Sequence, residues 1–335
     1  MSSRATEAGT GSAEICAEHL HKSFGGTVAV RDVSFEVARG EVIGFLGPNG
    51  AGKSTTLRMV TGVFPPTAGR ASIAGHDVVN EAIQARRSLG YLPERTSLYQ
   101  DMAVLDYLRF VADMKQIPAR ETGKAVTWAM GNTGTEHVSH RLIGNLSKGY
   151  RQRVGIAQAI LGDPSVLILD EPTSGLDPEQ VSDIRTLIRG LGDDKRTVVL
   201  STHILPEVEM ICSRVIILAR GRILAVDEPS RLERRLRPYR ELAARVVEAT
   251  DGMMTALRSL EHVSEVVVEA AKGDEEGGAS GTRVVVRLDH GFDRRREIAS
   301  KIVDSGAGLL ELTPVVMTLE EIFLKLVGDS EADVA

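Results

Sequence analysis

The octapeptide GPNGAGKS at residues 47–54 restricts the fold of this chain more than any other feature. It follows a compact apolar segment, residues 41–46, and precedes a segment with helical character, residues 54–60. A strand, a glycine-rich loop and a helix in this order direct backbone N–H groups and a helix N-terminus at a phosphate. A chance glycine-rich turn would have to fall between these two elements, so the sequence predicts a phosphate-binding site in an α/β fold.

Two side chains of this loop add chemistry to the phosphate site. Lys53 brings a full positive charge to the β- and γ-phosphate oxygens of a nucleotide, and the Ser54 hydroxyl can bind Mg²⁺. We therefore expect a nucleotide with β- and γ-phosphates, together with Mg²⁺, and the family resemblance given below identifies the expected nucleotide as ATP. The residues expected to contact the nucleotide are Gly47, Pro48, Asn49, Gly50, Ala51, Gly52, Lys53, Ser54 and Thr55.

An acidic pair follows a second apolar strand, residues 166–169. Ligands bind at the carboxyl ends of strands in open α/β sheets, which is where Asp170 and Glu171 should lie. Asp170 is expected to hold Mg²⁺, and Glu171 is expected to polarise the water that attacks the γ-phosphate. Two acids after a strand could instead cap a helix, and only the phosphate loop makes the catalytic interpretation the better one.

The segment LSKGYRQR at residues 146–153 resembles the ABC transporter signature motif, usually LSGGQ, and precedes the acidic strand at the family's customary place. Ser147 can cap the following helix, whose apolar residues recur at helical spacing. An ordinary capped helix would explain Ser147 but not the whole set of motifs. The resemblance implies that Ser147 and Gly149 meet the γ-phosphate of ATP bound to a second protomer.

The resemblance spans about residues 15–229 and implies further site residues. Phe24 resembles the aromatic residue that stacks on adenine, although aromatic residues more often lie in a core. The segment SGLD, ending at Asp177, resembles the loop through which two protomers contact each other. His203 resembles the histidine that contacts the γ-phosphate and fixes the attacking water.

The chain departs from the family pattern at three positions, Glu94, Lys148 and Tyr150. Glu94 stands where the family usually has a glutamine. Its carboxylate can accept a hydrogen bond or bind Mg²⁺ but cannot donate, so the expected metal ligands are Ser54, Asp170 and Glu94. Together with the ending LEEIFL at residues 319–324, these departures resemble the ATPase subunits of bacterial type-two exporters, including the gliding-motility-associated group.

The predicted fold class is α/β, a P-loop NTPase of the ABC ATPase type with an antiparallel β subdomain and a helical subdomain. A small C-terminal α+β domain of the ferredoxin-like split β-α-β type should follow it. The expected boundaries are a flexible N-terminus over 1–14, the ATPase domain over 15–230, its helical subdomain over about 95–163, the accessory domain over 231–328 and a tail over 329–335. We expect a linker in the basic run between Arg231 and Arg237.

Charge and apolar runs limit the partners. The net charge of −6 comes from well-mixed acids and bases, which argues against a nucleic-acid partner. Apolar runs are far shorter than the roughly 20 residues that span a bilayer, and residues 1–14 do not look like a signal peptide. We therefore expect a protein on the cytoplasmic, inner face of the cell membrane. It should act as a homodimer, or a heterodimer with a related ATPase, beneath separately encoded permease subunits.

Two other functions compete with a transport ATPase. A soluble ABC ATPase that regulates a ribosomal or DNA complex is the main alternative. Relatives of that kind carry two cassettes or long coiled coils, whereas this chain has one cassette and no sustained heptads. A P-loop kinase or GTPase would leave Ser147, Gly149 and His203 unexplained. The predicted activity is hydrolysis of ATP to ADP and phosphate, coupled to transport, and the resemblance to the type-two group implies export.

Overall fold

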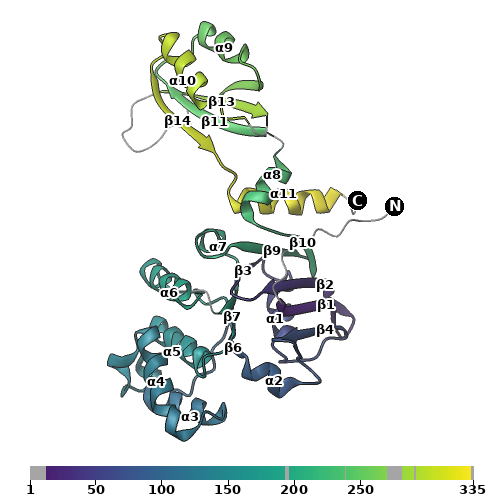
Figure 1. Cartoon of the computed structure of the whole chain (residues 1–335), viewed down its shortest axis with the longest axis vertical. Coiled ribbons are helices and arrows are strands. Elements are labelled where there is room, and N and C mark those ends of the chain that lie inside the picture. The colour runs from purple at the N-terminus through teal and green to yellow at the C-terminus, as the bar shows by residue number, and fades with distance from the viewer. Residues whose placement is uncertain (1–12, 193–195, 238, 270–280, 290–291, 333–335) are drawn as a thin grey trace. The chain divides into compact units, whose positions relative to one another are not determined.

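The computed structural model describes residues 13–192, 196–237, 239–269, 281–289 and 292–332 (Figure 1). The described residues divide into two compact units, one drawn from the ranges 1–229 and 326–335 and the other from the range 230–325. No helix among the described residues combines the length and the apolar composition needed to cross a bilayer.

The first unit begins with a four-stranded antiparallel sheet in the order β2-β1-β4-β5. Apolar and polar residues alternate in its strands, as in a sheet with one buried face: Val33, Phe35 and Val37 are buried, and the polar residues between them are exposed. The sequence predicted a flexible terminus over residues 1–14, but residues 13 and 14 belong to the first strand of this sheet. The strands are β1 (Ala13–Phe24), β2 (Thr27–Ala38), β4 (Ala68–Ile73) and β5 (His76–Asp77).

A six-stranded sheet in the order β10-β9-β3-β8-β7-β6 forms the centre of the first unit. All neighbours in it are parallel except β10, which pairs antiparallel to β9. Every residue of β7 and β8 is buried, as expected of parallel strands covered on both faces. The strands are β3 (Val42–Leu46), β6 (Leu89–Leu92), β7 (Val166–Asp170), β8 (Thr197–Thr202), β9 (Arg214–Ala219) and β10 (Arg222–Asp227).

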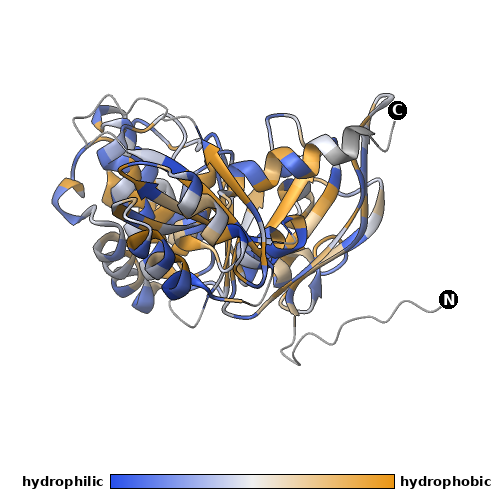
Figure 2. Ribbon diagram, turned by 90° about the horizontal axis from the view of Figure 1, so that it is seen from above, coloured by the Kyte–Doolittle hydropathy of each residue, from blue (hydrophilic) through white to orange (hydrophobic). Residues whose placement is uncertain are grey.

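Helices flank these sheets, and those between Val104 and Ile160 form the expected helical insertion. Within it, Lys115 donates to the carbonyl oxygens of Gln158, Ala159 and Leu161 at 3.0, 3.1 and 2.7 Å, which ties the end of α3 to the end of α5. In Figure 2 the strands carry much of the hydrophobic colour, whereas the helices alternate between hydrophobic and hydrophilic residues. The helices are α1 (Lys53–Val60), α2 (Ala82–Arg87), α3 (Val104–Met114), α4 (Ala119–Thr133), α5 (Lys148–Ile160), α6 (Pro178–Leu191) and α7 (Leu205–Ile211), with 3₁₀ turns η1 (Glu136–Val138) and η2 (Ile143–Asn145).

The second unit is an antiparallel sheet in the order β12-β13-β11-β14 with two helices that share its core. This order confirms the split β-α-β arrangement, in which the strand of a hairpin lies between the two strands of a crossover unit. Most of the expected hairpin loop, residues 273–281, lies outside the described residues. The elements are β11 (Tyr239–Val246), α9 (Asp251–Arg258), β12 (Val263–Glu269), β13 (Thr282–Asp289), α10 (Arg295–Asp304) and β14 (Leu309–Val315).

Two segments of the second half differ from the sequence prediction. The basic run expected as a linker is mostly helical, in α8 (Pro229–Leu236), because arginine, leucine and glutamate are good helix formers and a proline suits a first turn. Helix α11 (Leu319–Ala332) continues into the segment expected as a tail, so residues 329–332 are helical.

Candidate functional site

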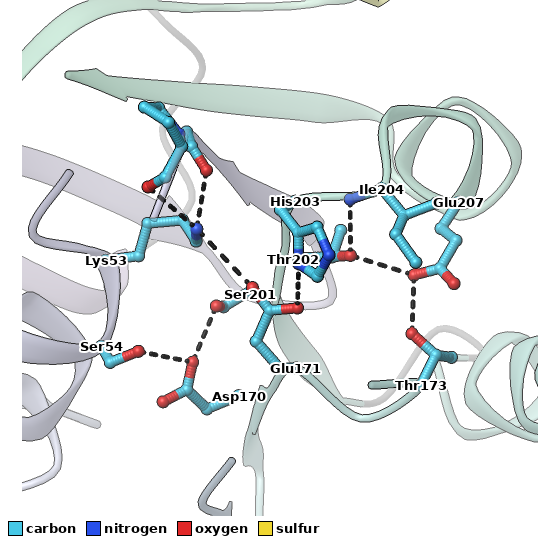
Figure 3. A network of polar contacts seen from close by, with 12 residues as sticks. Lys53, Ser54, Asp170, Glu171, Thr173, Ser201, Thr202, His203, Ile204 and Glu207 are labelled. Carbon is cyan, nitrogen blue, oxygen red and sulfur yellow. Dashed lines mark hydrogen bonds and ion pairs between the residues drawn. The ribbon is translucent and has the colours of Figure 1, made fainter. Parts of the chain in front are cut away.

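A cleft of about 500 Å³ lies at the carboxyl ends of the central parallel strands. The loop after β3 forms one wall, and residues that follow β6, β7 and β8 form the other. Figure 3 shows the polar network beside it. The lining residues are Ala29, Pro48, Asn49, Gly50, Ala51, Gly52, Lys53, Ser54, Thr55, Glu94, Glu171, Ser174 and His203.

The glycine-rich loop owes its shape to backbone conformations that other residues rarely adopt. Gly50 has φ +81° and Gly52 has φ +103°, and a Cβ on Gly52 would lie 2.8 Å from the Ala29 carbonyl oxygen. No side chain caps the N-terminus of α1, which starts at the next residue. The first backbone N–H groups of α1 are therefore free of a side-chain acceptor, as a phosphate site at a helix N-terminus requires.

Lys53 is a buried cation at the edge of this cleft. Its ammonium group donates to the carbonyl oxygen of Gly47 at 2.6 Å and to that of Pro48 at 3.4 Å. It also lies 3.6 Å from Oε1 of Glu171, which is itself buried. The loop thus holds the ammonium group beside the position where a nucleotide phosphate would lie, with one carboxylate as its counter-ion.

Asp170 is fully buried at the end of β7 and has one carboxylate oxygen without a partner. Oδ1 accepts from the hydroxyls of Ser201 at 2.7 Å and Ser54 at 3.2 Å, whereas Oδ2 has no hydrogen-bond partner among the described residues. Burial raises the pKa of Asp170, the two hydroxyl donors lower it, and the charges of Glu171 and Glu94 raise it further. A cation would relieve both the unpaired oxygen and the carboxylate repulsion.

The residues around Asp170 fit Mg²⁺ better than a metal held by protein alone. The described residues contain no group of three or more His, Cys, Asp or Glu side chains placed to hold a metal ion. Mg²⁺ is commonly bound by one or two carboxylates together with substrate phosphates and water. Ser54, Asp170 and Glu94 at a phosphate-binding cleft supply that limited set of oxygen ligands.

Glu171 and His203 form a pair across the ends of β7 and β8. His203 Nδ1 lies 2.8 Å from Oε2 of Glu171, while the other carboxylate oxygen, Oε1, faces Lys53. The backbone N–H of Glu171 donates to the Ser201 carbonyl at 2.9 Å, and Glu171 adopts φ +51°, a left-handed conformation that is strained for a residue with a side chain. Oε2 of Glu171 therefore lies against the His203 ring, and Oε1 lies beside the Lys53 ammonium group.

Neither the cleft lining nor the polar network around Asp170 and Glu171 includes the predicted site residues Ser147, Gly149 and Asp177. Ser147 caps α5 by accepting from the Tyr150 N–H at 3.4 Å, and Asp177 caps α6 by accepting from the Gln180 N–H at 2.9 Å. Gly149 is buried against Gln180, and a Cβ added to Gly149 would lie 2.8 Å from Oε1 of Gln180. A single chain therefore brings together the phosphate loop, Glu94, Asp170, Glu171 and His203, but not these three residues.

Phe24 also lies outside the set that lines the cleft, on an exposed strand end. Its ring is half-exposed, packs edge-to-face on Phe64 with centroids 5.6 Å apart, and has the Lys22 ammonium 5.3 Å from its centroid. This is an open aromatic surface and not a core position. Sequence reasoning missed Ser201, whose hydroxyl holds Asp170, although a hydroxyl two residues before the singled-out histidine was a usable signal.

Known proteins resemble this chain in sequence and fold. The sequence model of a family described as "ABC transporter" matches residues 30–174. The linearmycin resistance ATP-binding protein LnrL of Bacillus subtilis is 29% identical over 95% of this chain and 99% of its own length. The bacitracin transport ATP-binding protein BcrA of Bacillus licheniformis is 30% identical over 92% of this chain and 95% of its own length. The structure of cbiO1 from Clostridium perfringens, part of the ABC transporter complex cbiONQ, has 31% identity and a TM-score of 0.60, and covers 66% of this chain and 90% of cbiO1.

Proposed function

The chain belongs to the ABC transporter family of ATP-binding proteins, and on this premise we propose which of its residues bind and hydrolyse ATP. It is an ATP-binding subunit and an ATPase that powers a separate membrane permease. The observation that carries the proposed roles is the convergence of Lys53, Asp170, Glu171 and His203 beside the glycine-rich loop.

The proposed binding step places the nucleotide phosphates in the loop of residues 47–55. Lys53 then exchanges the carbonyl oxygens of Gly47 and Pro48 for phosphate oxygens. Ser54, Asp170 and Glu94 would hold Mg²⁺, which neutralises charge on the phosphates when bound. Phe24 offers its exposed ring to the adenine base, where stacking adds apolar contact.

The proposed hydrolysis step uses Glu171 as the general base. Its Oε2 is engaged by His203 Nδ1, so Oε1 is the oxygen that accepts a proton from the attacking water. Because the carboxylate is buried, few other water molecules compete with the attacking water for Oε1. His203 is exposed enough to contact the γ-phosphate while it orients Glu171.

We propose that the site is completed by a second protomer. Ser147, Gly149 and Asp177 do not line the cleft of their own chain, which supports contact with ATP bound to another copy. Two Mg-ATP molecules would then lie between the phosphate loop of one protomer and the signature helix α5 of the other. Closure and reopening would reach the permease through residues 94–105 and the helical insertion. The partner is a second copy of this chain or a related ATPase.

Export is the direction of transport that we propose, with the subunit on the cytoplasmic face of the membrane. The relatives named for linearmycin resistance and bacitracin transport support this choice over the alternative of a soluble regulatory ATPase. We assign the chain to the type-two exporter group on the residues at 94, 148 and 150. The accessory domain, proposed for residues 231–328, contributes none of the proposed nucleotide residues and is suited to an interaction role.

A disulfide test checks the two-protomer site. Asn49→Cys on the phosphate loop and Ser147→Cys on the signature helix should form a bond between two chains when Mg-ATP is present. Asn49 is preferable to Gly50 as the first position because Gly50 has φ +81°. Cys16 and Cys212 are replaced beforehand, and Glu171→Gln slows the loss of ATP. Crosslinked dimers on non-reducing gels are the expected result.

The control pairs Asn49→Cys with Lys124→Cys, because Lys124 is exposed on α4 and outside the proposed site. This pair should not crosslink. A bond that forms only within one chain, or equal crosslinking with and without ATP, would refute the two-protomer site.

Glu94→Gln tests the carboxylate that replaces the usual glutamine. Glu94 lies in the cleft and its charge raises the pKa of Asp170, so the substitution removes repulsion and one candidate Mg²⁺ ligand together. We expect turnover within about threefold of wild type and a higher Mg²⁺ concentration for half-maximal ATPase activity. Titration of Mg²⁺ at saturating ATP measures both, with Glu121→Gln, an exposed carboxylate on α4, as control. Complete loss of activity with intact nucleotide binding would show instead that Glu94 has a catalytic task of its own.

A further inference from the structure

Glu207 is a buried carboxylate that does not line the cleft. It lies in the first turn of α7 and is only 1% exposed. Its Oε2 accepts hydrogen bonds from the Thr173 hydroxyl at 2.9 Å and the Thr202 hydroxyl at 3.1 Å, as Figure 3 shows. One carboxylate oxygen therefore joins two threonines, one in the turn after β7 and the other at the end of β8.

Each threonine is close in sequence to a proposed catalytic residue. Thr173 follows Glu171 by two residues at the end of β7, and Thr202 directly precedes His203 at the end of β8. Both threonines are buried. The Thr202 hydroxyl accepts from the Ile204 N–H at 3.0 Å and donates its single proton to Glu207. Glu207 thus bridges the two loops that carry the Glu171–His203 pair.

The environment of Glu207 argues against a role in stability alone. No ion pair of Glu207 occurs within the described part of the chain, and its second oxygen, Oε1, is buried without a hydrogen-bond partner there. Burying a carboxylate on two neutral donors is expensive, and an apolar side chain of similar size would remove that penalty. Hydrogen bonds to an ionised acceptor are, however, short and about twice as strong as neutral ones, which suits a device that fixes geometry.

We propose that Glu207 is a positioning residue for ATP hydrolysis. Through Thr173 and Thr202 it holds the two loops so that Glu171 and His203 keep their 2.8 Å contact. The inference rests on the proposed role of Glu171 as general base. Small displacements of a catalytic group are costly, since a shift of about 1 Å can lower a rate by about 100-fold.

Steady-state kinetics of the full chain with Mg-ATP test this role. Glu207→Leu, which removes both acceptor contacts, should lower kcat by at least about 10-fold and leave KM for ATP within about threefold, because the phosphate loop is untouched. Glu207→Gln keeps a carbonyl oxygen that can accept from both threonines, so its kcat should stay within about threefold of wild type. A residue that only stabilises the fold would not produce this split, nor this rescue.

Control and companion variants separate the possible explanations. Glu209→Leu changes an exposed carboxylate on the same helix and should leave kcat unchanged. Thr173→Val and Thr202→Val each remove one donor at nearly constant volume, and either should lower kcat. Neither should add its full effect to that of Glu207→Leu, because the three residues form one network. Thermal unfolding of each variant identifies the folded ones.

Three results would overturn the inference. They are a folded Glu207→Leu protein with kcat within twofold of wild type, a Glu207→Gln protein as slow as Glu207→Leu, and full activity in both threonine variants. Full activity in both threonine variants would overturn the inference even if Glu207→Leu does not fold. An inactive wild-type chain would refute the proposed function itself, whereas an active wild type, a slow Glu171→Gln variant and a normal Glu207→Leu variant would refute only the role of Glu207.

Discussion

Replacing Glu171 with glutamine should lower ATP turnover by at least about 100-fold, the lower end of the contribution of a general base. The glutamine keeps the size and one acceptor oxygen of the side chain but cannot take a proton from water. His203 would still lie beside it, and Lys53 would lose the carboxylate 3.6 Å away, which leaves the ammonium group more available to a phosphate. Nucleotide affinity should therefore be unchanged or higher.

Single-turnover ATPase assays and equilibrium binding of ATP distinguish these two effects. A nucleotide-bound dimer of Glu171→Gln should also accumulate during size-exclusion chromatography, because hydrolysis no longer releases it. Glu121→Gln, an exposed carboxylate on α4 whose ion pair with Arg120 contributes little, is the matched control. Turnover close to wild type in the Glu171→Gln variant would remove Glu171 from the role of base.

Lys53→Met should abolish measurable ATPase activity and weaken ATP binding, with turnover reduced by at least about 100-fold, as for loss of a preorganised charge contact. Methionine retains most of the apolar stem but leaves the phosphates without a cation. It also leaves Glu171 buried without its nearest cationic partner, so the protein carries an uncompensated carboxylate in the cleft. Both consequences oppose the binding of a polyanion.

Titration of the variant with a fluorescent ATP analogue, with and without Mg²⁺, measures the loss of affinity. Lys124→Met removes an exposed lysine of α4 and should behave as wild type. Retention of wild-type affinity in Lys53→Met would mean that the ammonium group stays on the carbonyl oxygens of Gly47 and Pro48 when nucleotide binds, contrary to the exchange proposed above.

The sequence predicted the elements that depend only on residues close together in the chain. The loop at residues 47–54 needs glycine at positions of positive φ, and such positions can be read directly from a sequence. The buried strand β7 is a continuous apolar run, so the position of Asp170 and Glu171 at its end was predictable. The four strands of the second unit, and the helices α9 and α10 that share its core, were likewise indicated by alternation and helical spacing.

Contacts between distant segments could not be predicted in the same way. The hydroxyl of Ser201 reaches Asp170 only because β7 and β8 are paired with Asp170 opposite Ser201. Glu207 meets Thr173 across 34 positions in the sequence. The basic and polar composition between Pro229 and Pro238 indicates a linker, whereas the helix propensity of arginine and leucine favours α8.

The left-handed backbone of Glu171 favours a different residue from the one that its proposed role as general base requires. A residue with a side chain at φ +51° costs about 1 to 3 kcal/mol, and glycine would relieve most of that strain while removing the carboxylate. Selection for thermal stability and selection for turnover therefore act in opposite directions at this one position. If Glu171 is the general base as proposed, a library of variants screened only for heat resistance would be enriched in inactive proteins altered at residue 171.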